Sequence, residues 1–506
     1  MEFGSLLLKG FSVALTPVNL AWLLGGSILG TLFGMIPGFG PSTGIALLLP
    51  LCLGLRPETA LIAMAAIYYG AMFGGSRSSI LMNVPGDSAA VASCFDGYPM
   101  ARNGQAEAAL AVSAVASLMG GLFASVAFTL LALPAARIAL RFGPPETFCL
   151  MVFSLAATAA VSRENLLKGL ISLVLGLMIS TVGLDSPSGV SRFTFGLEQL
   201  QTGFSFVVVI LGIYGFSEVL INLETLALET ARPLQLEFRW IQISMAHWRR
   251  SIGPILRQSP VGFLIGILPG AGAGIAALRA YRNEKKRSPH PEEFGKGAVE
   301  GLAAPEAANN ACSIGAMLPM MTLGVPGSGT AAVMLGGLLL CGLQPGPLLF
   351  EPQPGIGWAV IASLFLGNFA CAVINLPLAG FLVRILSIPP KAFYPFVVAV
   401  SFLGLYTVNF SVTDLYLLVG MGICGYLMKK FRIPTGPLVL ASVVGSSVES
   451  SFRQSLELSG GSPSIFFRSS ISSGLLLAAA LALAWPLVAG WWSRWKVSKP
   501  AERPGE

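Results

Sequence analysis

The chain has 506 residues, of which 54% are hydrophobic and only 11% are charged, and its mean hydropathy is +0.75. This charge content is less than half that of an average soluble domain, so the composition excludes a soluble globular protein and predicts a polytopic membrane protein. The formal net charge is +7. The basic residues lie in short blocks between apolar segments, which indicates membrane topology rather than a nucleic-acid-binding surface.

Apolar stretches follow one another along the chain, and several are shorter than the roughly 20 residues of a straight membrane span. We expect an all-α polytopic membrane protein with about ten to twelve transmembrane helices, some of them broken or paired as hairpins. The stretches lie near residues 11–36, 44–55, 58–75, 107–133, 146–161, 166–184, 203–222, 259–278, 298–321, 328–343, 356–383, 392–410, 413–428, 433–446 and 466–492.

Two apolar stretches are interrupted by the same pattern of glycine and proline. Residues 30–41 (GTLFGMIPGFGP) and residues 262–273 (GFLIGILPGAGA), about 230 residues later, both follow G-x-x-x-G-x-x-P-G-x-G. A single G-x-x-x-G often marks only close helix packing. A Pro-Gly interruption at membrane depth, repeated in both halves of a chain, is typical of a transport site, because unpaired backbone is tolerated there only around a cavity.

A second interruption follows the first in each half. Residues 78–91 (SSILMNVPGDSAAV) and residues 319–333 (PMMTLGVPGSGTAAV) share Val-Pro-Gly followed by small and hydroxyl residues. Two ordered pairs at nearly the same separation predict an internal repeat. We therefore divide the chain into a first transmembrane repeat (1–222), a cytoplasmic connector (223–258), a second transmembrane repeat (259–492) and a cytoplasmic C-terminal tail (493–506).

The positions of the basic residues predict the orientation. Arginines and lysines are concentrated in 222–258, 279–287, 428–432 and 492–499, whereas 344–357 and 404–413 contain neither. The positive-inside rule places the first set in the cytoplasm and the second outside. The segment 260–278 leaves one basic block and enters another, so we expect a hairpin with Pro269 and Gly270 at its tip.

The loops that follow the second interruptions differ in charge. The loop in the first half (DGYPMARNGQ) contains Arg102 and is expected inside, while its counterpart (CGLQPGPLLFEPQPG) has no basic residue and is expected outside. Matching loops on opposite sides predict inverted repeats.

Few polar residues occur within apolar sequence, and each has two interpretations. Arg77 either belongs to an anion site or is an interfacial, snorkelling arginine. Asp87 either helps to bind a coupling cation or caps the next half-helix. The hydroxyl residues beside the breaks either contact a substrate carboxylate and Na⁺ or replace backbone hydrogen bonds lost at the breaks. A further polar cluster contains Glu300, Glu306, Asn309 and Asn310, although Pro305 makes their helical register unsafe.

The candidate substrate-binding residues come from the two pairs of breaks and their flanks. They are Pro37, Gly38, Gly40, Arg77, Ser78, Ser79, Asn83, Pro85, Gly86, Pro269, Gly270, Gly272, Pro326, Gly327, Ser328 and Thr330. Asp87, Ser88 and Thr322 form the candidate cation site.

Three stretches carry a resemblance to a known family. GTLFGMIPGFGPSTG, YYGAMFGGSRSSILMNVPGDSAAV with the following FDGYPMARNGQAEAAL, and PEAANNACSIGAMLPMMTLGVPGSGTAAVMLGGLLLCGLQPGPLLF resemble the large membrane subunit of tripartite tricarboxylate transporters, the TctA family. The likeness covers nearly the whole chain in the expected order. A small hydroxyl residue is expected in that family where Arg77 stands, and this departure leaves the substrate open.

The resemblance implies the permease of a binding-protein-dependent secondary transporter in the bacterial inner membrane, with a cytoplasmic C-terminus. Its expected partners are a small four-helix membrane subunit and a periplasmic solute-binding protein. Its expected substrate is a di- or tricarboxylate or a related organic acid, taken up by cation symport with Na⁺ as the coupling ion. No cofactor and no nucleic-acid partner are expected.

Two other classes of protein are considered. An enzyme or an ATP-driven pump is not expected, because the chain has no P-loop, and GAGAG at 270–274 lacks the βαβ setting of a dinucleotide loop. An ion or organic-anion channel remains an alternative, because a Gly/Pro-interrupted helix can equally line a pore.

Overall fold

The computed structural model describes residues 2–36, 38–161, 165–185, 188–225, 244–351, 355–376 and 390–497. Within these residues the chain is almost entirely helical, and the predicted all-α polytopic membrane class is confirmed. The α-helices are α1 (Glu2–Ala14), α2 (Pro17–Met35), α3 (Pro41–Cys52), α4 (Pro57–Met82), α5 (Val91–Met100), α6 (Ala106–Ala139), α7 (Pro144–Val161), α8 (Leu166–Ser180), α9 (Phe206–Ile210), α10 (Ser217–Thr225), α11 (Met245–Ile267), α12 (Gly272–Arg287), α13 (Val299–Leu323), α14 (Gly329–Leu340), α15 (Ile356–Asn375), α17 (Pro390–Asn409), α18 (Val412–Lys430), α19 (Gly436–Leu458) and α20 (Ser470–Val497).

Short elements join these helices. Strands β1 (Gly183–Leu184) and β2 (Ser191–Arg192) pair antiparallel, with Gly183 opposite Arg192. The π-helical segments η1 (Ala101–Gln105) and η3 (Leu211–Phe216) continue α5 into α6 and α9 into α10. The short 3₁₀ turns are η2 (Glu198–Leu200), η4 (Pro291–Glu293), η5 (Pro347–Phe350) and η6 (Pro463–Phe467).

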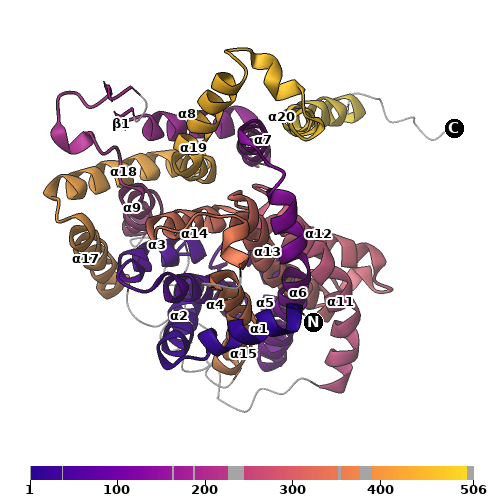
Figure 1. Ribbon diagram of the computed structural model, residues 1–506. Coiled ribbons are helices and arrows are strands. Elements are labelled where there is room, and N and C mark those ends of the chain that lie inside the picture. Colours follow the sequence, from indigo (N-terminus) through magenta and orange to yellow (C-terminus); the bar gives the residue numbers. More distant parts are fainter. Residues whose placement is uncertain are drawn as a thin grey trace.

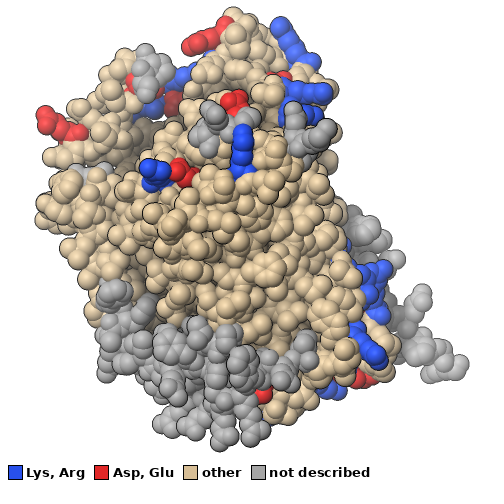
Figure 2. All heavy atoms as spheres, turned by 60° about the horizontal axis from the view of Figure 1, so that its bottom comes forward, with Lys and Arg blue, Asp and Glu red and all other residues tan. Residues whose placement is uncertain are grey.

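Several of the helices have the length and composition of membrane spans. Seven helical stretches of the described chain are long and apolar enough to cross a bilayer, namely 17–35, 57–82, 91–139, 144–161, 206–224, 356–375 and 412–430. Shorter apolar helices lie at 4–14, 41–52, 166–180, 329–340, 397–408 and 470–486. Figure 2 shows the corresponding surface, in which charged side chains lie along the upper part and the right edge and a broad middle expanse shows none.

The helices form two groups in Figure 1. Helices α7, α8, α19 and α20 lie together at the top, and α2, α4, α5, α6, α13 and α15 lie below them, with α3 and α14 between the two groups. Helix α4 is the centre of the lower group, because every residue of its apolar span is buried. Its neighbours include α2, α3, α5, α13 and α15, so it contacts elements from both halves of the sequence.

The same helical unit occurs twice. In the first half, α2 and α3 are joined by a tight turn and are followed by α4, which ends at Asn83 in a left-handed conformation (φ 57°). In the second half, α11 and α12 are joined in the same way and are followed by α13, which ends at Gly324 (φ 70°). The glycines of the two tight turns, Gly38 and Gly270, also share a positive φ of 83° and 74°. The backbone therefore repeats the duplication predicted from the sequence.

The G-x-x-x-G motifs have a packing role in both copies. A Cβ on Gly34 of α2 would lie 2.2 Å from the carbonyl oxygen of Ala71 on α4, and one on Gly266 of α11 would lie 2.3 Å from that of Cys312 on α13. Only glycine allows such close backbone approach, which is the usual function of this motif between membrane helices. The packing interpretation of G-x-x-x-G is therefore correct in this chain.

The predicted hairpin at 260–278 corresponds to α11 and α12, which pack against each other on either side of Gly270. Helix α11 begins at Met245 and so occupies the end of the stretch predicted as a connector, 223–258. Residues 226–243 of that stretch and 498–506 of the predicted tail lie outside the described residues.

Candidate functional site

The two breaks of each repeat touch each other. A Cβ placed on Gly86 would lie 1.8 Å from the carbonyl oxygen of Gly34, and one on Gly327 would lie 2.0 Å from that of Gly266. These distances are too short for any side chain, so the Val-Pro-Gly break rests directly on the helix that leads into the first break. The predicted residues Gly86 and Gly327 are thus glycines for the same steric reason in both repeats.

The breaks of opposite repeats also meet. The hydroxyl groups of Ser42, at the start of α3, and Thr330, at the start of α14, are 2.9 Å apart. In the reciprocal position, a Cβ on Gly274 of α12 would lie 2.9 Å from the carbonyl oxygen of Ser88. Because the start of each hairpin's second arm meets the second break of the other repeat, the two repeats are related by a pseudo-two-fold axis.

A cavity of about 520 Å³ lies at one of these junctions. Its walls are the turn before α12 and the first turn of that helix, the predicted cation-site residue Ser88, the end of α7, and the last turn of α18 with the chain after it. The lining residues are Ser88, Val161, Gly270, Ala271, Gly272, Ala273, Gly274, Ile275, Lys429, Arg432, Ile433 and Pro434. The sequence analysis predicted Gly270, Gly272 and Ser88 as site residues, and the structure brings these three together.

The chemistry of this cavity suits an anion. The first backbone N–H groups of α12, at Gly272, Ala273 and Gly274, have no carbonyl acceptor within their own helix, and the helix dipole adds positive potential there. Lys429 and Arg432 add two cationic side chains to the same walls. Its volume falls within the range of about 300–1,000 Å³ that is usual for small-molecule sites.

Lys429 connects the cavity to the first repeat. Its Nζ donates a hydrogen bond of 2.5 Å to Glu218 Oε1, and the two side chains are only 19% and 16% exposed. A Cβ on Gly38 would lie 3.1 Å from the other oxygen of Glu218. The ion pair therefore lies between the turn of the first hairpin and the cavity at the second.

Lys429, Arg432 and Glu218 were not predicted as site residues. The sequence analysis counted the two basic residues among the blocks that set topology, and it did not single out Glu218. The available signal was a carboxylate inside the apolar stretch 203–222. Its partner could not be found from spacing, because 211 positions separate Glu218 from Lys429.

Arg77, Ser78 and Ser79 lie inside α4, in the turns before the break. Arg77 is 1% exposed, and its Nε and one terminal nitrogen donate to Asn375 Oδ1 and to the Leu110 carbonyl oxygen, each at 3.1 Å. The hydroxyls of Ser78 and Ser79 donate to the Gly75 carbonyl. These bonds agree with the interpretation that hydroxyls repair the backbone, and none of the three residues lines the 520 Å³ cavity.

The second break of each repeat is capped by a side chain. Asp87 Oδ1 accepts the backbone N–H groups of Ala89 and Ala90 at 3.1 and 3.0 Å. Ser328 Oγ accepts the N–H of Ala331 at 3.1 Å. Ser328 is thus the N-cap of α14, whereas Ala89 and Ala90 precede α5, so Asp87 stabilises the turn before that helix and is not its N-cap.

The remaining predicted residues flank these contacts. Ser328 also shares a hydrogen bond of 2.9 Å with the Tyr68 hydroxyl, and Thr322 donates to the Leu318 carbonyl of its own helix at 2.8 Å. Gly40 lies against the Cβ of Asp87, 3.2 Å from the position of an added Cβ. Asn83, Pro85, Pro269 and Pro326 form the turns themselves, while Pro37 lies outside the described residues.

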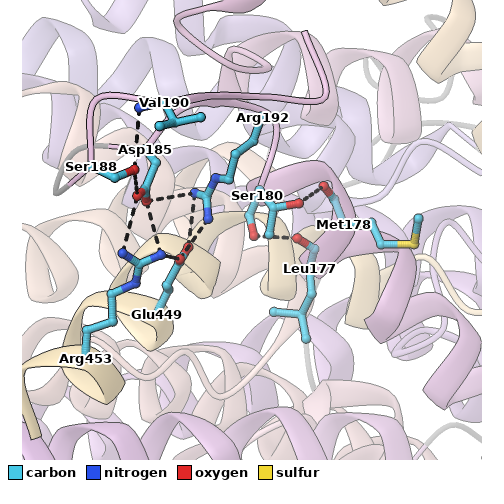
Figure 3. A network of polar contacts seen from close by, with 10 residues as sticks. Leu177, Met178, Ser180, Asp185, Ser188, Val190, Arg192, Glu449 and Arg453 are labelled. Carbon is cyan, nitrogen blue, oxygen red and sulfur yellow. Dashed lines mark hydrogen bonds and ion pairs between the residues drawn. The ribbon is translucent and has the colours of Figure 1, made fainter. Parts of the chain in front are cut away.

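A larger cavity, of about 860 Å³, lies between α7, α19 and the β1–β2 hairpin. Figure 3 shows its charged wall, in which Arg192 and Arg453 alternate with Asp185 and Glu449. The Ser188 hydroxyl and then the two arginines hold the pKa of Asp185 below its usual value. Both arginines here are paired with carboxylates, whereas at the smaller cavity Lys429 is paired and the start of α12 adds free N–H groups. None of the predicted site residues lines the larger cavity, so the smaller cavity is the better anion site.

A comparison with protein families decides the identity. The model described as "Tripartite tricarboxylate transporter TctA family" matches residues 20–440, which is most of the chain. The chain belongs to the TctA family. The resemblance drawn from the break motifs is therefore confirmed, and the TctA assignment identifies the chain as a multi-pass membrane component of a tripartite transporter rather than an enzyme.

Two Agrobacterium vitis proteins are similar to this TctA chain. One, named "Uncharacterized 52.8 kDa protein in TAR-I ttuC' 3'region", is 39% identical over 476 residues and covers 94% of both chains. The other, named "Uncharacterized protein in TAR-II ttuC' 3'region", is 37% identical over 215 residues, which are 42% of this chain and 89% of that protein. No solved structure matches the chain.

Proposed function

We propose that this chain is the permease subunit of a secondary transporter that imports carboxylates by cation symport with alternating access. The observation that carries the proposal is the 520 Å³ cavity, in which the start of α12, Ser88, Lys429 and Arg432 come together. A carboxylate can accept hydrogen bonds from the free N–H groups of α12 and pair with a cationic side chain. A di- or tricarboxylate can use both kinds of donor at once.

The charge distribution supports an inner-membrane orientation with the basic helix ends in the cytoplasm. Lys168, at the start of α8, donates to the Phe431 carbonyl at 2.6 Å, so the basic ends of α8 and α18 lie together. The basic residues of α11 and α12 lie at the outer ends of their hairpin, away from Gly270. The opposite orientation of the repeats, with the pseudo-two-fold axis in the membrane plane, is supported by the matching loops, of which one contains Arg102 and the other, 344–357, contains no Lys or Arg.

The transporter family supplies the expected partners. These are a small four-helix membrane subunit and a periplasmic binding protein that delivers the carboxylate. Na⁺ is the expected coupling ion, because the broken helices offer the oxygen ligands that hard cations prefer.

Neighbouring lysines provide the test of the anion site. Lys429 lines the cavity and pairs with Glu218, whereas Lys430 pairs with Glu224 at 2.5 Å and is absent from the cavity wall. Loss of a buried charge contact costs about 2–5 kcal/mol, or roughly thirtyfold or more in affinity. Lys429→Gln should therefore weaken uptake of labelled carboxylates into proteoliposomes at least about tenfold, and Lys430→Gln should leave it unchanged. Equal effects of both variants would argue against an anion site at this cavity.

Counterflow separates the carrier from the alternative of a channel. Proteoliposomes preloaded with unlabelled carboxylate should accumulate labelled carboxylate above equilibrium, because a carrier exchanges substrate and a channel does not. Uptake should collapse when the Na⁺ gradient is removed. Accumulation that needs ATP, or flux without counterflow, would contradict the proposal.

A further inference from the structure

A carboxylate is buried at the contact between the two repeats. Glu306, on α13, has no exposed surface. Its Oε2 accepts the hydroxyls of Ser76 on α4 and Ser117 on α6 at 2.6 and 3.1 Å, and its Oε1 accepts that of Ser93 on α5. We call these four residues the Glu306 cluster. It gathers five oxygen atoms from four helices, three of the first repeat and one of the second.

The nearby cation does not neutralise this carboxylate directly. Arg77 follows Ser76 in α4, and its charge interacts with that of Glu306. Its guanidinium is turned instead toward Asn375 and the Leu110 carbonyl, and no ion pair within 4.0 Å joins it to a carboxylate in the described chain. A buried charge without a contacting counter-ion is costly. Because the Arg77 guanidinium is bonded to Asn375 and Leu110, the Glu306 carboxylate can interact with a cation that binds and leaves.

A second carboxylate makes this region more negative. Asp87 caps the break that follows α4, and its charge interacts with that of Glu306. Two carboxyl groups therefore share the surroundings of one arginine. Asp87 precedes Ser88, which lines the 520 Å³ cavity, so the chain runs directly from this carboxyl group to the proposed anion site.

Buried oxygen atoms without partners lie one turn away. Asn309 and Asn310 follow Glu306 by three and four residues, which places them on the same face of α13. Ser113 precedes Ser117 by one turn of α6. All three side chains are 1% exposed, and within the described residues the amide oxygens of the two asparagines and the Ser113 hydroxyl have no hydrogen-bond partner. Buried polar atoms in native proteins are almost always satisfied, so these point to an absent ligand.

We propose that the Glu306 cluster is the binding site of the coupling cation and that this cation is Na⁺. The inference rests on the symport proposed above and places its cation at Glu306 rather than at Asp87, Ser88 and Thr322. Carboxylate, hydroxyl and amide oxygens are the ligands of a hard cation, and nitrogen ligands are not needed. A bound cation would also join α4, α5 and α6 to α13, so that its binding is linked to the relative position of the two repeats.

Thermal unfolding of the purified full-length chain tests the site without transport. The midpoint is measured in NaCl and in KCl or choline chloride of equal ionic strength, together with equilibrium binding of ²²Na⁺. Wild-type protein should show a saturable, Na⁺-specific rise in the midpoint, because a ligand of the folded state stabilises it. Glu306→Gln should abolish this rise and the ²²Na⁺ binding.

The matched control is Glu300→Gln, the same change six residues earlier in α13, where Glu300 pairs with Arg250. This variant should keep the full Na⁺ response. If Glu306→Gln does not fold, Ser76→Ala removes one hydroxyl from the cluster and should lower the Na⁺ affinity about tenfold, the usual cost of losing one metal-site contact.

Three results would overturn the proposal. These are an unchanged Na⁺ response in Glu306→Gln or in Ser76→Ala, a response lost only in Asp87→Asn, and stabilisation that follows pH but not Na⁺. The test is separate from that of the function. Carboxylate counterflow with no Na⁺ binding at Glu306 would remove only the cation site. Na⁺ binding without counterflow would remove the transport proposal and the coupling role of the cation, and would leave a Na⁺ site at Glu306.

Discussion

The second breaks of the two repeats have the same backbone but different chemistry. Gly86 and Gly327 are 241 positions apart, and each packs against the backbone carbonyl of a glycine in a helix. A Cβ added to either would lie 1.8 or 2.0 Å from that carbonyl oxygen. Asn83 and Gly324, separated by the same interval, both end their helix in the left-handed conformation. The steric requirements of the turn have thus been kept in both copies.

The charged residues of this region occur in only one copy each. At the same interval of 241 positions, Glu306 corresponds to Ala65, Arg77 to Leu318 and Asp87 to Ser328. The two repeats therefore share a backbone conformation, but the buried charged side chains occur at only one of each pair of equivalent positions. We infer that the backbone symmetry serves the conformational change and that the charge asymmetry fixes what is bound.

The largest expected effect tests the symmetric part. Gly86→Ala and Gly327→Ala each force a methyl group into a carbonyl oxygen, and the contact is backbone in both cases. Both variants should lose folded protein in the membrane to a similar degree, as judged by size-exclusion profile and thermal unfolding. Gly25→Ala is the control, because nothing lies within 4 Å of its added Cβ. If only one of the two variants loses folded protein, the two breaks are not structurally equivalent.

The next effect tests the asymmetric part. Arg77→Leu gives the first repeat the residue of the second and leaves Asn375 and the Leu110 carbonyl without their donor. A hydrogen bond from a charged group contributes about 1.5–3 kcal/mol, and two are lost here, so the unfolding free energy should fall by roughly 3–6 kcal/mol. The control Leu318→Met should cost less than about 1.5 kcal/mol.

Arg77→Lys refines this test. A lysine keeps the charge but cannot donate along the two directions that the guanidinium uses. Uptake should therefore fall at unchanged expression. Wild-type uptake and stability in this variant would show that Arg77 contributes only its charge.

The sequence predicted the repeated part well because its causes are local. Glycine and proline are required by the backbone at each break, so both hairpins and both interruptions could be placed from the motifs.

The contacts of the buried charged residues could not be predicted from the sequence, because they join segments that are far apart in the chain. Glu306 was noticed, but Pro305 made its register uncertain, and its three serines come from residues 76, 93 and 117. Proline in fact lies inside α13 without ending it. Lys429 was assigned to topology because nothing in the sequence indicates that it meets Glu218.

Exchange of the two caps is expected to have a smaller effect. Asp87→Ala removes the acceptor of two N–H groups in the turn before α5, and Ser328→Ala removes the N-cap of α14. Losses of this kind cost about 0.5–2 kcal/mol each. Asp87→Ser keeps a cap of the type found in the second repeat and should recover most of that loss in thermal unfolding. If Asp87→Ser is as unstable as Asp87→Ala, the carboxylate has a role at this break beyond capping.

The smallest effect concerns the contact between the repeats. The hydroxyl groups of Ser42 and Thr330 share one hydrogen bond of 2.9 Å. At the equivalent contact Gly274 lies against Ser88, and a glycine has no side chain with which to form such a bond. Ser42→Ala should therefore lower the unfolding free energy by only about 1 kcal/mol, the usual net value of such a bond. Thr330→Val should cost about the same, and the double variant should cost little more than either alone, because both changes remove the same interaction. Additive losses in this cycle would show that the two hydroxyls act independently and that the repeats are not held together here.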